Sequence, residues 1–271
     1  MKASMTTGEL EEELRKRLAE GSLDLVPLPG VAQRVLSIAN DDGQGAVELA
    51  KLVQQDAALA ASVLRRANSA GEAGATRIAS VQQAIARLGS RKVAETAIAT
   101  SLRQGVLGAS RYPDLMQRMW RHSLASGLFA KEIARSLRTN VELAFLAGLL
   151  WRIGEALALV AVSDEPEWSS ADASVVAGAA EHLGEELAGL AARRWNLPEA
   201  IASAIDPAAP EGRTRRLARL ARRLAENATE EIGIENEQGH ADAVALNLYP
   251  EDLESIGSRA DAILEECEAI Q

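Results

Sequence analysis

Ala147-Gly148-Leu149-Leu150-Trp151-Arg152-Ile153-Gly154 lies within an apolar segment, Val141 to Val162, whose hydrophobic residues follow the spacing of an α-helix. No stretch of this segment alternates apolar and polar residues as a half-buried strand does. Arg152 and Glu155 interrupt the apolar run before it reaches the roughly 20 residues that a membrane-spanning helix needs. The segment therefore predicts helical structure and no membrane span.

Helical spacing continues on both sides of this segment. Before residue 110, apolar residues at every third or fourth position indicate a bundle of about five short helices, and a capping box at Ser80 to Gln83 opens one of them. Further helices are predicted at 8–20, 115–137, 141–162, 172–195, 198–205, 213–227 and 250–270, and breaks or turns at 27–30, 40–43, 206–210 and 233–239. We therefore predict an all-α fold in which an N-terminal helical bundle packs on a second helical core.

The composition limits the function classes. Of the 271 residues, 47% are hydrophobic but only 3% are aromatic, which favours closely packed helices rich in Ala, Leu, Val and Ile. The net charge of −10 argues against a general nucleic-acid binder. Cys267 is the only cysteine, so no intramolecular disulfide can form, and residues 1–19 lack the apolar core of a secretion signal. We expect a cytoplasmic protein.

A series of short motifs, none of them specific alone, occurs in an order typical of one family. The motifs are Leu28-Pro29-Gly30-Val31, Leu49-Ala50-Lys51-Leu52-Val53-Gln54-Gln55-Asp56, Leu64-Arg65-Arg66-Ala67-Asn68-Ser69-Ala70, Ala84-Ile85-Ala86-Arg87-Leu88-Gly89, Trp120-Arg121-His122-Ser123, Ala144-Phe145-Leu146-Ala147-Gly148-Leu149-Leu150 and Trp195-Asn196-Leu197-Pro198. On these motifs, residues 25–210 resemble an HDOD domain, a helical relative of the HD and HD-GYP metal phosphohydrolases.

The resemblance implies a domain organisation. A charged helix at 1–24 precedes an HDOD-like domain at 25–210, which consists of the N-terminal bundle (25–110) and a degenerate HD-like core (111–210). A C-terminal helical extension follows at 211–271. HDOD proteins generally lack the full metal site of their relatives, so the resemblance implies a bacterial signalling or regulatory module that acts by binding other molecules.

The resemblance also identifies what replaces the metal site. His122 matches the first metal-ligand His of the HD superfamily, while Trp151 and Arg152 stand where its adjacent His and Asp would be. An indole offers only an N–H donor, and a guanidinium is a permanent cation without a lone pair for a metal. One imidazole does not make a metal site, which ordinarily needs three or more protein ligands. We therefore expect no metal, no cofactor and no catalytic residue.

Two departures from the family pattern concern other positions. Ala57 replaces the Pro that often follows the Gln-Asp pair, a change expected only to alter the start of a helix. Asp206-Pro207-Ala208 replaces a pair of His residues that often follows the Trp-x-Leu-Pro helix, which removes further metal ligands. His182 lies near the position of a later superfamily ligand but about two residues out of alignment, and His240 is expected to be exposed in a polar turn.

The residues of the altered site have two interpretations. Trp151 and Arg152 can bind a planar anionic ligand by stacking and by bidentate contacts to phosphate or carboxylate, with His122 in the same cleft. Alternatively, Trp151 fills the vacated metal pocket and Arg152 pairs with an acid such as Glu155 or Glu181. On the second interpretation, which we favour, His122 is a core or cleft histidine bonded to a neighbour.

One helix carries the only strongly basic cluster of the chain. Its arginines flank an apolar stripe of Leu217, Leu220, Ala221 and Leu224, so they must occupy the polar face of an amphipathic helix. The cluster is either a solvated face paired with local acids or a docking patch for an acidic partner or for nucleic acid. The residues of the candidate docking patch are Arg213, Arg216, Arg219 and Arg223.

These observations predict a non-enzymatic regulatory module. Its expected partner is another signalling protein; a small anionic ligand or a nucleotide is an alternative, while nucleic acid is not expected. Two other functions stay open: a residual metal-dependent phosphohydrolase or phosphodiesterase, and a nucleotide-sensing or nucleic-acid-binding regulator that uses Trp151, Arg152 or the arginine helix.

Overall fold

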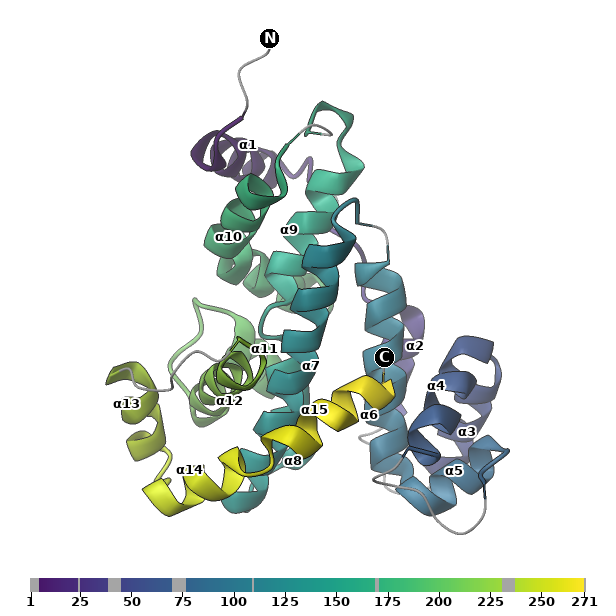
Figure 1. Ribbon diagram of the computed structural model, residues 1–271. Coiled ribbons are helices and arrows are strands. Elements are labelled where there is room, and N and C mark those ends of the chain that lie inside the picture. The colour runs from purple at the N-terminus through teal and green to yellow at the C-terminus, as the bar shows by residue number, and fades with distance from the viewer. Residues whose placement is uncertain are drawn as a thin grey trace. The chain divides into compact units, whose positions relative to one another are not determined.

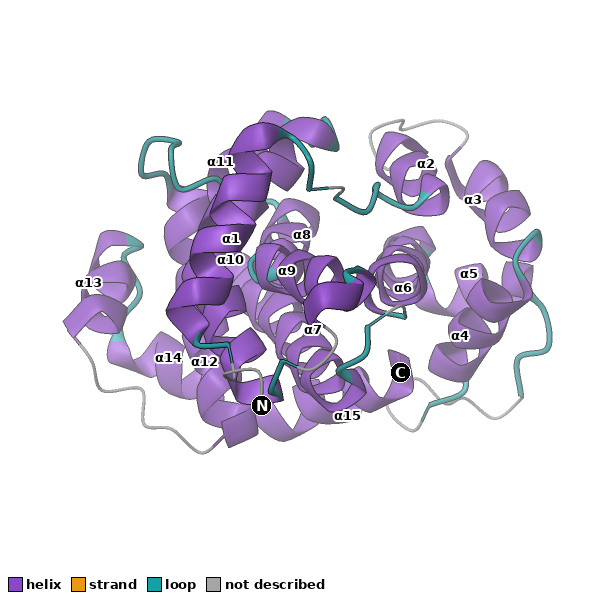
Figure 2. Ribbon diagram, turned by 90° about the horizontal axis from the view of Figure 1, so that it is seen from above, coloured by secondary structure: helices purple, strands orange, loops and turns teal. Residues whose placement is uncertain are grey.

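The computed structural model is built from helices, and it contains no strand in the part of the chain that it describes (Figure 1, Figure 2). The described residues are 5–23, 25–38, 45–69, 77–108, 110–168, 171–230 and 237–270. The predicted all-α class is confirmed. The predicted turn at 40–43 and most of the polar turn predicted at 233–239 lie outside the described residues, and residues 237–239 begin a helix instead.

The chain divides into two compact units. Unit 1 contains Met1–Pro27 and Val106–Glu254, and unit 2 contains Leu28–Gly105 and Ser255–Gln271. The bundle predicted at 25–110 therefore corresponds to the first segment of unit 2. The extension predicted at 211–271 is not one body, because its last helix belongs to unit 2 and the rest to unit 1.

Unit 1 is organised around helices that pack in pairs, α7 with α8 and α9 with α10, while α12 covers both α7 and α8. Its elements are α1 (Thr7–Glu20), α7 (Pro113–Ser136), α8 (Val141–Leu150), α9 (Ile153–Asp164), the 3-10 turn η2 (Pro166–Trp168), α10 (Ala173–Arg194), α11 (Glu199–Ile205), α12 (Arg213–Glu230), α13 (Glu237–Ala245) and the first residues of α14 (Pro250–Gly257).

The stretch that contains Trp151 and Arg152 forms the turn between α8 and α9. Two glycines allow this turn to approach its neighbours closely: a Cβ at Gly148 would lie 2.6 Å from the Ser126 carbonyl oxygen, and one at Gly154 would collide with the Gly184 carbonyl oxygen. Val141–Asp164 is the one described segment apolar enough to cross a membrane, and 89% of its most apolar window is buried in the protein. That burial fits a segment of the protein core.

The N-terminal helix α1 docks on α10 rather than lying free in solvent. Thr6 and Glu9 form a capping box at its start, and Leu10 and Leu14 are fully buried. Near its end, Arg17 stacks over the Trp168 ring at 4.4 Å and pairs with glutamates of the α9–η2 region. Two buried leucines and the contacts of Arg17 together hold a helix whose other side chains are mostly charged.

Unit 2 is a bundle of short helices. They are α2 (Gly30–Ile38), α3 (Gly45–Gln54), α4 (Ala57–Ala67), α5 (Val81–Leu88), α6 (Ser90–Leu102) and α15 (Ala260–Ile270), with the π-helical turn η1 (Arg103–Leu107) at its edge. The predicted N-cap is confirmed, because the Ser80 hydroxyl accepts the Gln83 backbone N–H. Gly89, at φ 82°, separates α5 from α6.

The C-terminal region forms two helices where one was predicted at 250–270. Helix α14 ends at Gly257, and α15 begins at Ala260. Gly and Ser have low helix propensity, which favours a break at Gly257-Ser258. This break lets α15 take its own direction and pack on α4 and α6 of unit 2.

Candidate functional site

A small cavity of about 140 Å³ opens in unit 1 where α7, α9 and α10 meet. Charged side chains of both signs and one histidine surround it, together with apolar residues that form its floor. The lining residues are Leu115, Arg118, Met119, His122, Arg152, Glu155, Leu159, Ala177 and Glu181. Two of the predicted site residues, His122 and Arg152, therefore lie in one cavity.

Arg152 and Glu155 form an ion pair at the start of α9. Nε of Arg152 lies 2.9 and 3.0 Å from the two carboxylate oxygens of Glu155, and its Nη2 lies 2.6 Å from Oε2. Arg152 is the N-cap residue of α9 and Glu155 is in its first turn, where the partial positive charge of the helix end favours a carboxylate. Gly184 leaves room for this arrangement, because a Cβ there would lie 2.6 Å from Cγ of Glu155.

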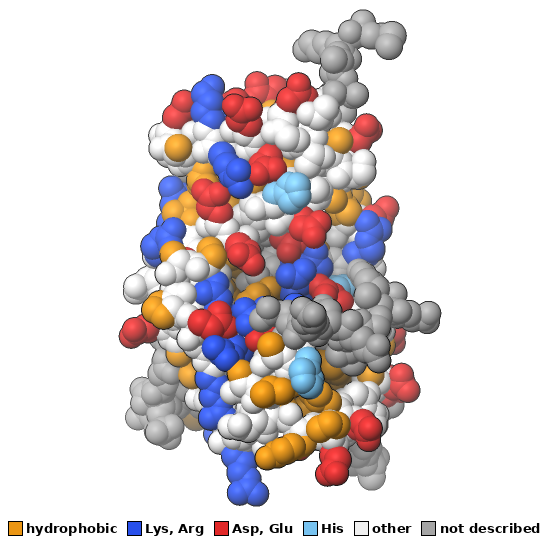
Figure 3. All heavy atoms as spheres, turned by 90° about the vertical axis from the view of Figure 1, so that its left-hand side faces the viewer, with side chains coloured by type: hydrophobic (Ala, Val, Ile, Leu, Met, Phe, Trp, Pro, Cys, Tyr) orange, Lys and Arg blue, Asp and Glu red, His pale blue; other side chains and the backbone are white. Residues whose placement is uncertain are grey.

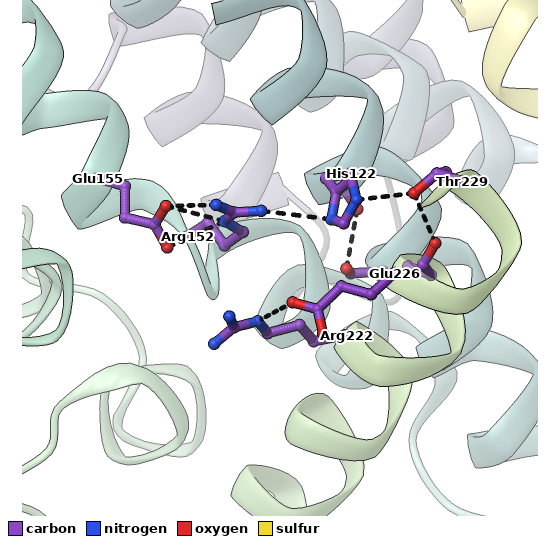
Figure 4. Close-up of polar contacts among 8 residues, drawn as sticks. His122, Arg152, Glu155, Arg222, Glu226 and Thr229 are labelled. Atoms are coloured by element: carbon purple, nitrogen blue, oxygen red, sulfur yellow. Dashed lines mark hydrogen bonds and ion pairs between the residues drawn. The ribbon is translucent and has the colours of Figure 1, made fainter. Parts of the chain in front are cut away.

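His122, on α7, is buried between Arg152 and Thr229 (Figure 4). Its Nδ1 lies 3.3 Å from Nη1 of Arg152, and its Nε2 lies 2.7 Å from Oγ1 of Thr229. A guanidinium can only donate, so Nδ1 must accept and Nε2 carries the proton. Nε2–H then donates to the Thr229 hydroxyl, which in turn donates to the Ala225 carbonyl at 2.8 Å. These two contacts therefore join the imidazole to Arg152 on one side and to Thr229 on the other.

The residues at this position do not fit a divalent cation. Among the described residues, no group of three or more His, Cys, Asp or Glu side chains could hold a metal ion. The Arg152 guanidinium also places a fixed positive charge beside His122, and this charge repels a cation.

Trp151, the third predicted residue of this site, does not line the cavity. It is half-buried at the C-terminal end of α8. Although it precedes Arg152 in the sequence, it takes no part in the contacts among His122, Arg152 and Glu155. The other two histidines lie elsewhere. His182 is exposed on α10, where Nδ1 lies 2.9 Å from a Glu11 carboxylate oxygen, and His240 is exposed as expected but belongs to α13 rather than to a turn.

The arginines of α12 are mostly engaged within unit 1. Arg219 makes contacts of 2.5 and 2.7 Å to the buried Asp242 carboxylate and a third to Glu211, and the hydrogen bonds with Asp242 raise the pKa of Arg219 above its ordinary value. Arg222 pairs with Glu226 at 2.6 Å (Figure 4). On the face shown in Figure 3, basic and acidic side chains lie next to one another over much of the surface.

The four residues of the predicted docking patch differ in their surroundings. Arg216 lies 3.5 Å from Glu211, and Arg219 is held by Asp242. Arg213 is exposed, and Arg223 is half-buried with a partner of its own. Asp242 lies 23 residues beyond Arg219, so no local sequence pattern indicates this pair.

Sequence reasoning also missed Thr229 and Arg118. Thr229 lies 107 residues from His122, and its role follows only from the packing of α12 on α7. Arg118 is one helical turn before His122 on α7, and this spacing is the signal that could have placed it beside the same cavity.

The model of the HDOD domain family matches residues 25–209 of this chain. A protein from Shewanella amazonensis SB2B, provisionally assigned as a metal-dependent phosphohydrolase, is 21% identical with a TM-score of 0.70, and the match covers 97% of both chains. A Marinobacter aquaeolei VT8 protein, provisionally assigned to signal transduction, is 25% identical with a TM-score of 0.72, over 97% of this chain and 66% of that one.

A third structure similar to this chain is an HDOD domain protein of unknown function from Geobacter sulfurreducens. It is 22% identical, with a TM-score of 0.62, and the match covers 94% of this chain and 97% of that one. No curated protein matches the chain significantly. At these identities, the Shewanella and Geobacter structures show that the fold is shared.

Proposed function

Because the chain belongs to the HDOD domain family, we propose that it is a regulatory module that acts by binding a signalling protein or a small ligand and does not hydrolyse phosphate esters. One observation carries the proposal. The Arg152 guanidinium lies between the Glu155 carboxylate and Nδ1 of His122, at the position where the resemblance to HD phosphohydrolases expects a metal-binding Asp.

The chemistry of these three side chains argues against hydrolysis. A metal phosphohydrolase uses the ion to generate a nucleophilic hydroxide and to stabilise charge on the phosphoryl oxygens. Here the Glu155 carboxylate is bound to Arg152, and the Nδ1 lone pair of His122 faces the same guanidinium. Neither group is therefore placed to take a proton from water or to hold a cation.

A binding role is consistent with the solved structure at 25% identity, whose protein is provisionally assigned to signal transduction. Binding to another protein would also explain why the HD-like fold persists after its metal ligands are replaced, since the helical surface does not depend on the ion.

The proposal is tested with the purified protein. Hydrolysis of p-nitrophenyl phosphate and bis(p-nitrophenyl) phosphate is measured with added Mn²⁺, Fe²⁺, Ni²⁺ or Zn²⁺, and bound metal is measured by elemental analysis after dialysis. We expect no turnover above that of the His122→Ala variant and no stoichiometric metal. Turnover that needs His122, or near-stoichiometric metal lost in that variant, would reject the proposal.

The cavity supports a second candidate function, the binding of a small anion. Arg118 lines the cavity and is exposed, and it has no hydrogen bond or ion pair with the described residues. The cavity volume of about 140 Å³ is well below the roughly 300–1,000 Å³ of pockets for larger ligands, so a phosphate or small carboxylate fits better than a nucleotide.

Thermal denaturation in the presence of phosphate, acetate or a nucleoside monophosphate tests this second function. We expect the small anions to raise the melting temperature of the wild type more than that of Arg118→Ala. The matched control is Arg121→Ala, because Arg121 is an exposed arginine on the same helix that does not line the cavity. Equal shifts in all three proteins would assign the effect to general salt stabilisation.

A further inference from the structure

Helix α15 belongs to unit 2 and packs on α4 and α6 (Figure 1, Figure 2). Ile263, Cys267 and Ile270 are buried at positions i, i+4 and i+7, and they face α4 and α6. This spacing is the one by which amphipathic helices bind hydrophobic grooves of other proteins. The surface formed by α4 and α6 therefore binds an amphipathic helix, α15, within the same chain.

The charges of the two contacting parts are complementary. Residues 28–105 carry nine Lys or Arg and six Asp or Glu, although the whole chain has a net charge of −10. Helix α15 carries four acidic residues and no Lys or Arg. The bundle is therefore the basic part of an acidic protein, and the helix that covers it is acidic, so electrostatic attraction favours an acidic occupant of this surface.

Arg66 anchors the contact. It lies on α4, is only 1% exposed, and pairs through Nη2 with Glu266 of α15. Its Nε and Nη1 are buried without any hydrogen-bond acceptor among the described residues. An arginine usually binds a carboxylate through two parallel N–H groups, and a buried donor left unpaired is unfavourable. Helix α15 therefore satisfies only part of the site.

We propose that the α4–α6 surface of unit 2 is a docking site for an acidic amphipathic helix of a partner protein, and that α15 occupies this site until the partner displaces it. The partner helix presents apolar residues at i, i+4 and i+7 and a carboxylate at i+3, the pattern of Ile263, Cys267, Ile270 and Glu266. The proposal names a partner class for the regulatory binding proposed above and rests on that function.

The thiol of Cys267 can be used to measure the displacement of α15. Cys267 is the only cysteine of the chain, lies on the buried face of α15 and is 0% exposed. The rate at which 5,5′-dithiobis(2-nitrobenzoic acid) labels this thiol therefore measures how often α15 leaves the surface. Because a thiol buried in a contact reacts only after that contact opens, the measurement needs no foreign probe.

The first test alters the anchor in the full chain. We expect Glu266→Arg to raise the labelling rate about tenfold or more, because it places a second cation beside the buried Arg66. The matched control is Glu265→Arg, because Glu265 is the exposed neighbouring residue and has no ion pair with the described residues; we expect it to stay within about twofold. The double exchange Arg66→Glu with Glu266→Arg should restore slow labelling.

The second test supplies an occupant in trans. The probe is an acetylated peptide of residues 258–271 in which Cys267 is replaced by Ser. A short tether gives α15 an effective concentration of the order of millimolar, so we expect the peptide to accelerate labelling in a saturable way at about 1 mM. The same peptide with Glu266→Arg should have a much weaker effect. Circular dichroism of each variant separates release of α15 from unfolding.

Several outcomes would overturn the proposal. These are unchanged labelling in Glu266→Arg, no effect of the peptide at millimolar concentration, or equal acceleration by both peptides. Acceleration by an oligonucleotide but not by the peptide would assign the surface to nucleic acid, and protection that grows with dimer formation would assign it to a second copy. None of these results depends on the hydrolysis assay, so failure here is distinct from failure of the proposed function.

Discussion

Two arginines, a half-buried one in unit 1 and a fully buried one in unit 2, are held in opposite ways. Arg152 of unit 1 directs Nε and Nη2 to Glu155 and Nη1 to His122, so each nitrogen of its guanidinium has a partner. Arg66 of unit 2 is more deeply buried but uses only Nη2, and its partner lies 200 residues away on a terminal helix. A completed network favours one fixed structure, whereas an incomplete one leaves room for a better partner.

The largest loss of stability is expected where the turn that contains Arg152 packs closely against α10. Gly154→Ala places a Cβ against the backbone of Gly184 and Ala188, which cannot move as a flexible side chain would. We expect a loss of about 3 kcal/mol or more in the free energy of unfolding, measured by urea denaturation. Gly8→Ala is the control, because a Cβ there meets nothing within 4 Å; it should keep or raise stability.

Replacing Arg152, whose guanidinium nitrogens all have partners, tests how much its contacts contribute to stability. Arg152→Met leaves the Glu155 carboxylate, whose side chain is 10% exposed, without its cation and Nδ1 of His122 without its donor. We expect a loss of about 2–3 kcal/mol in the free energy of unfolding. Arg118→Met, at an exposed residue of the same cavity, should change stability by less than about 0.5 kcal/mol. Equal losses would mean that the network contributes nothing specific.

A smaller loss of stability is expected at Thr229, which contacts the far side of His122 from Arg152. Thr229→Val removes the hydroxyl that accepts from Nε2 of His122 while keeping the shape of the side chain. We expect a loss of about 1 kcal/mol in denaturant titration. Thr214→Val on the same helix is the control, since the Thr214 side chain makes no hydrogen bond with the described residues. If Thr229→Val leaves the free energy of unfolding unchanged, Nε2 of His122 must donate to another acceptor in the variant.

Replacing Arg66, which has only one paired guanidinium nitrogen, is expected to change the free energy of unfolding least. Arg66→Met replaces a buried guanidinium with two unpaired nitrogens by an apolar side chain of similar length. Glu266, whose side chain is 33% exposed, can then turn to water. We expect stability to stay unchanged or to rise by about 1 kcal/mol, the opposite of Arg152→Met. A loss of more than about 3 kcal/mol would show that both arginines have the same structural role.

The sequence predicts the helices well because their signals are local. Apolar residues at helical spacing and the Ser80 cap need only a few neighbouring residues, and Glu155 lies one turn after Arg152, so this pairing was among the expected ones. The motif series likewise placed His122 and Arg152 in a common site, and the structure brings them within 3.3 Å.

The features that were missed depend on packing between helices far apart in sequence. Thr229 reaches His122, and Asp242 holds Arg219, only because α12 lies on α7 and beside α13. Gly154 and Gly184 are unremarkable residues in the sequence, and their importance follows from the close approach of α9 to α10. The docking of α15 on the first bundle, 200 residues upstream, has no local signal at all.

Arg152 also has a consequence for the chain before it folds. Val141–Asp164 spans 24 residues, and its most apolar 18-residue window has a mean hydropathy of 1.8, which by length and composition is enough for a membrane-spanning helix. A cation at the centre of such a segment opposes insertion by about 2.5–3.5 kcal/mol. Arg152, which pairs with Glu155 in the folded protein, therefore also opposes insertion of the nascent segment into a membrane.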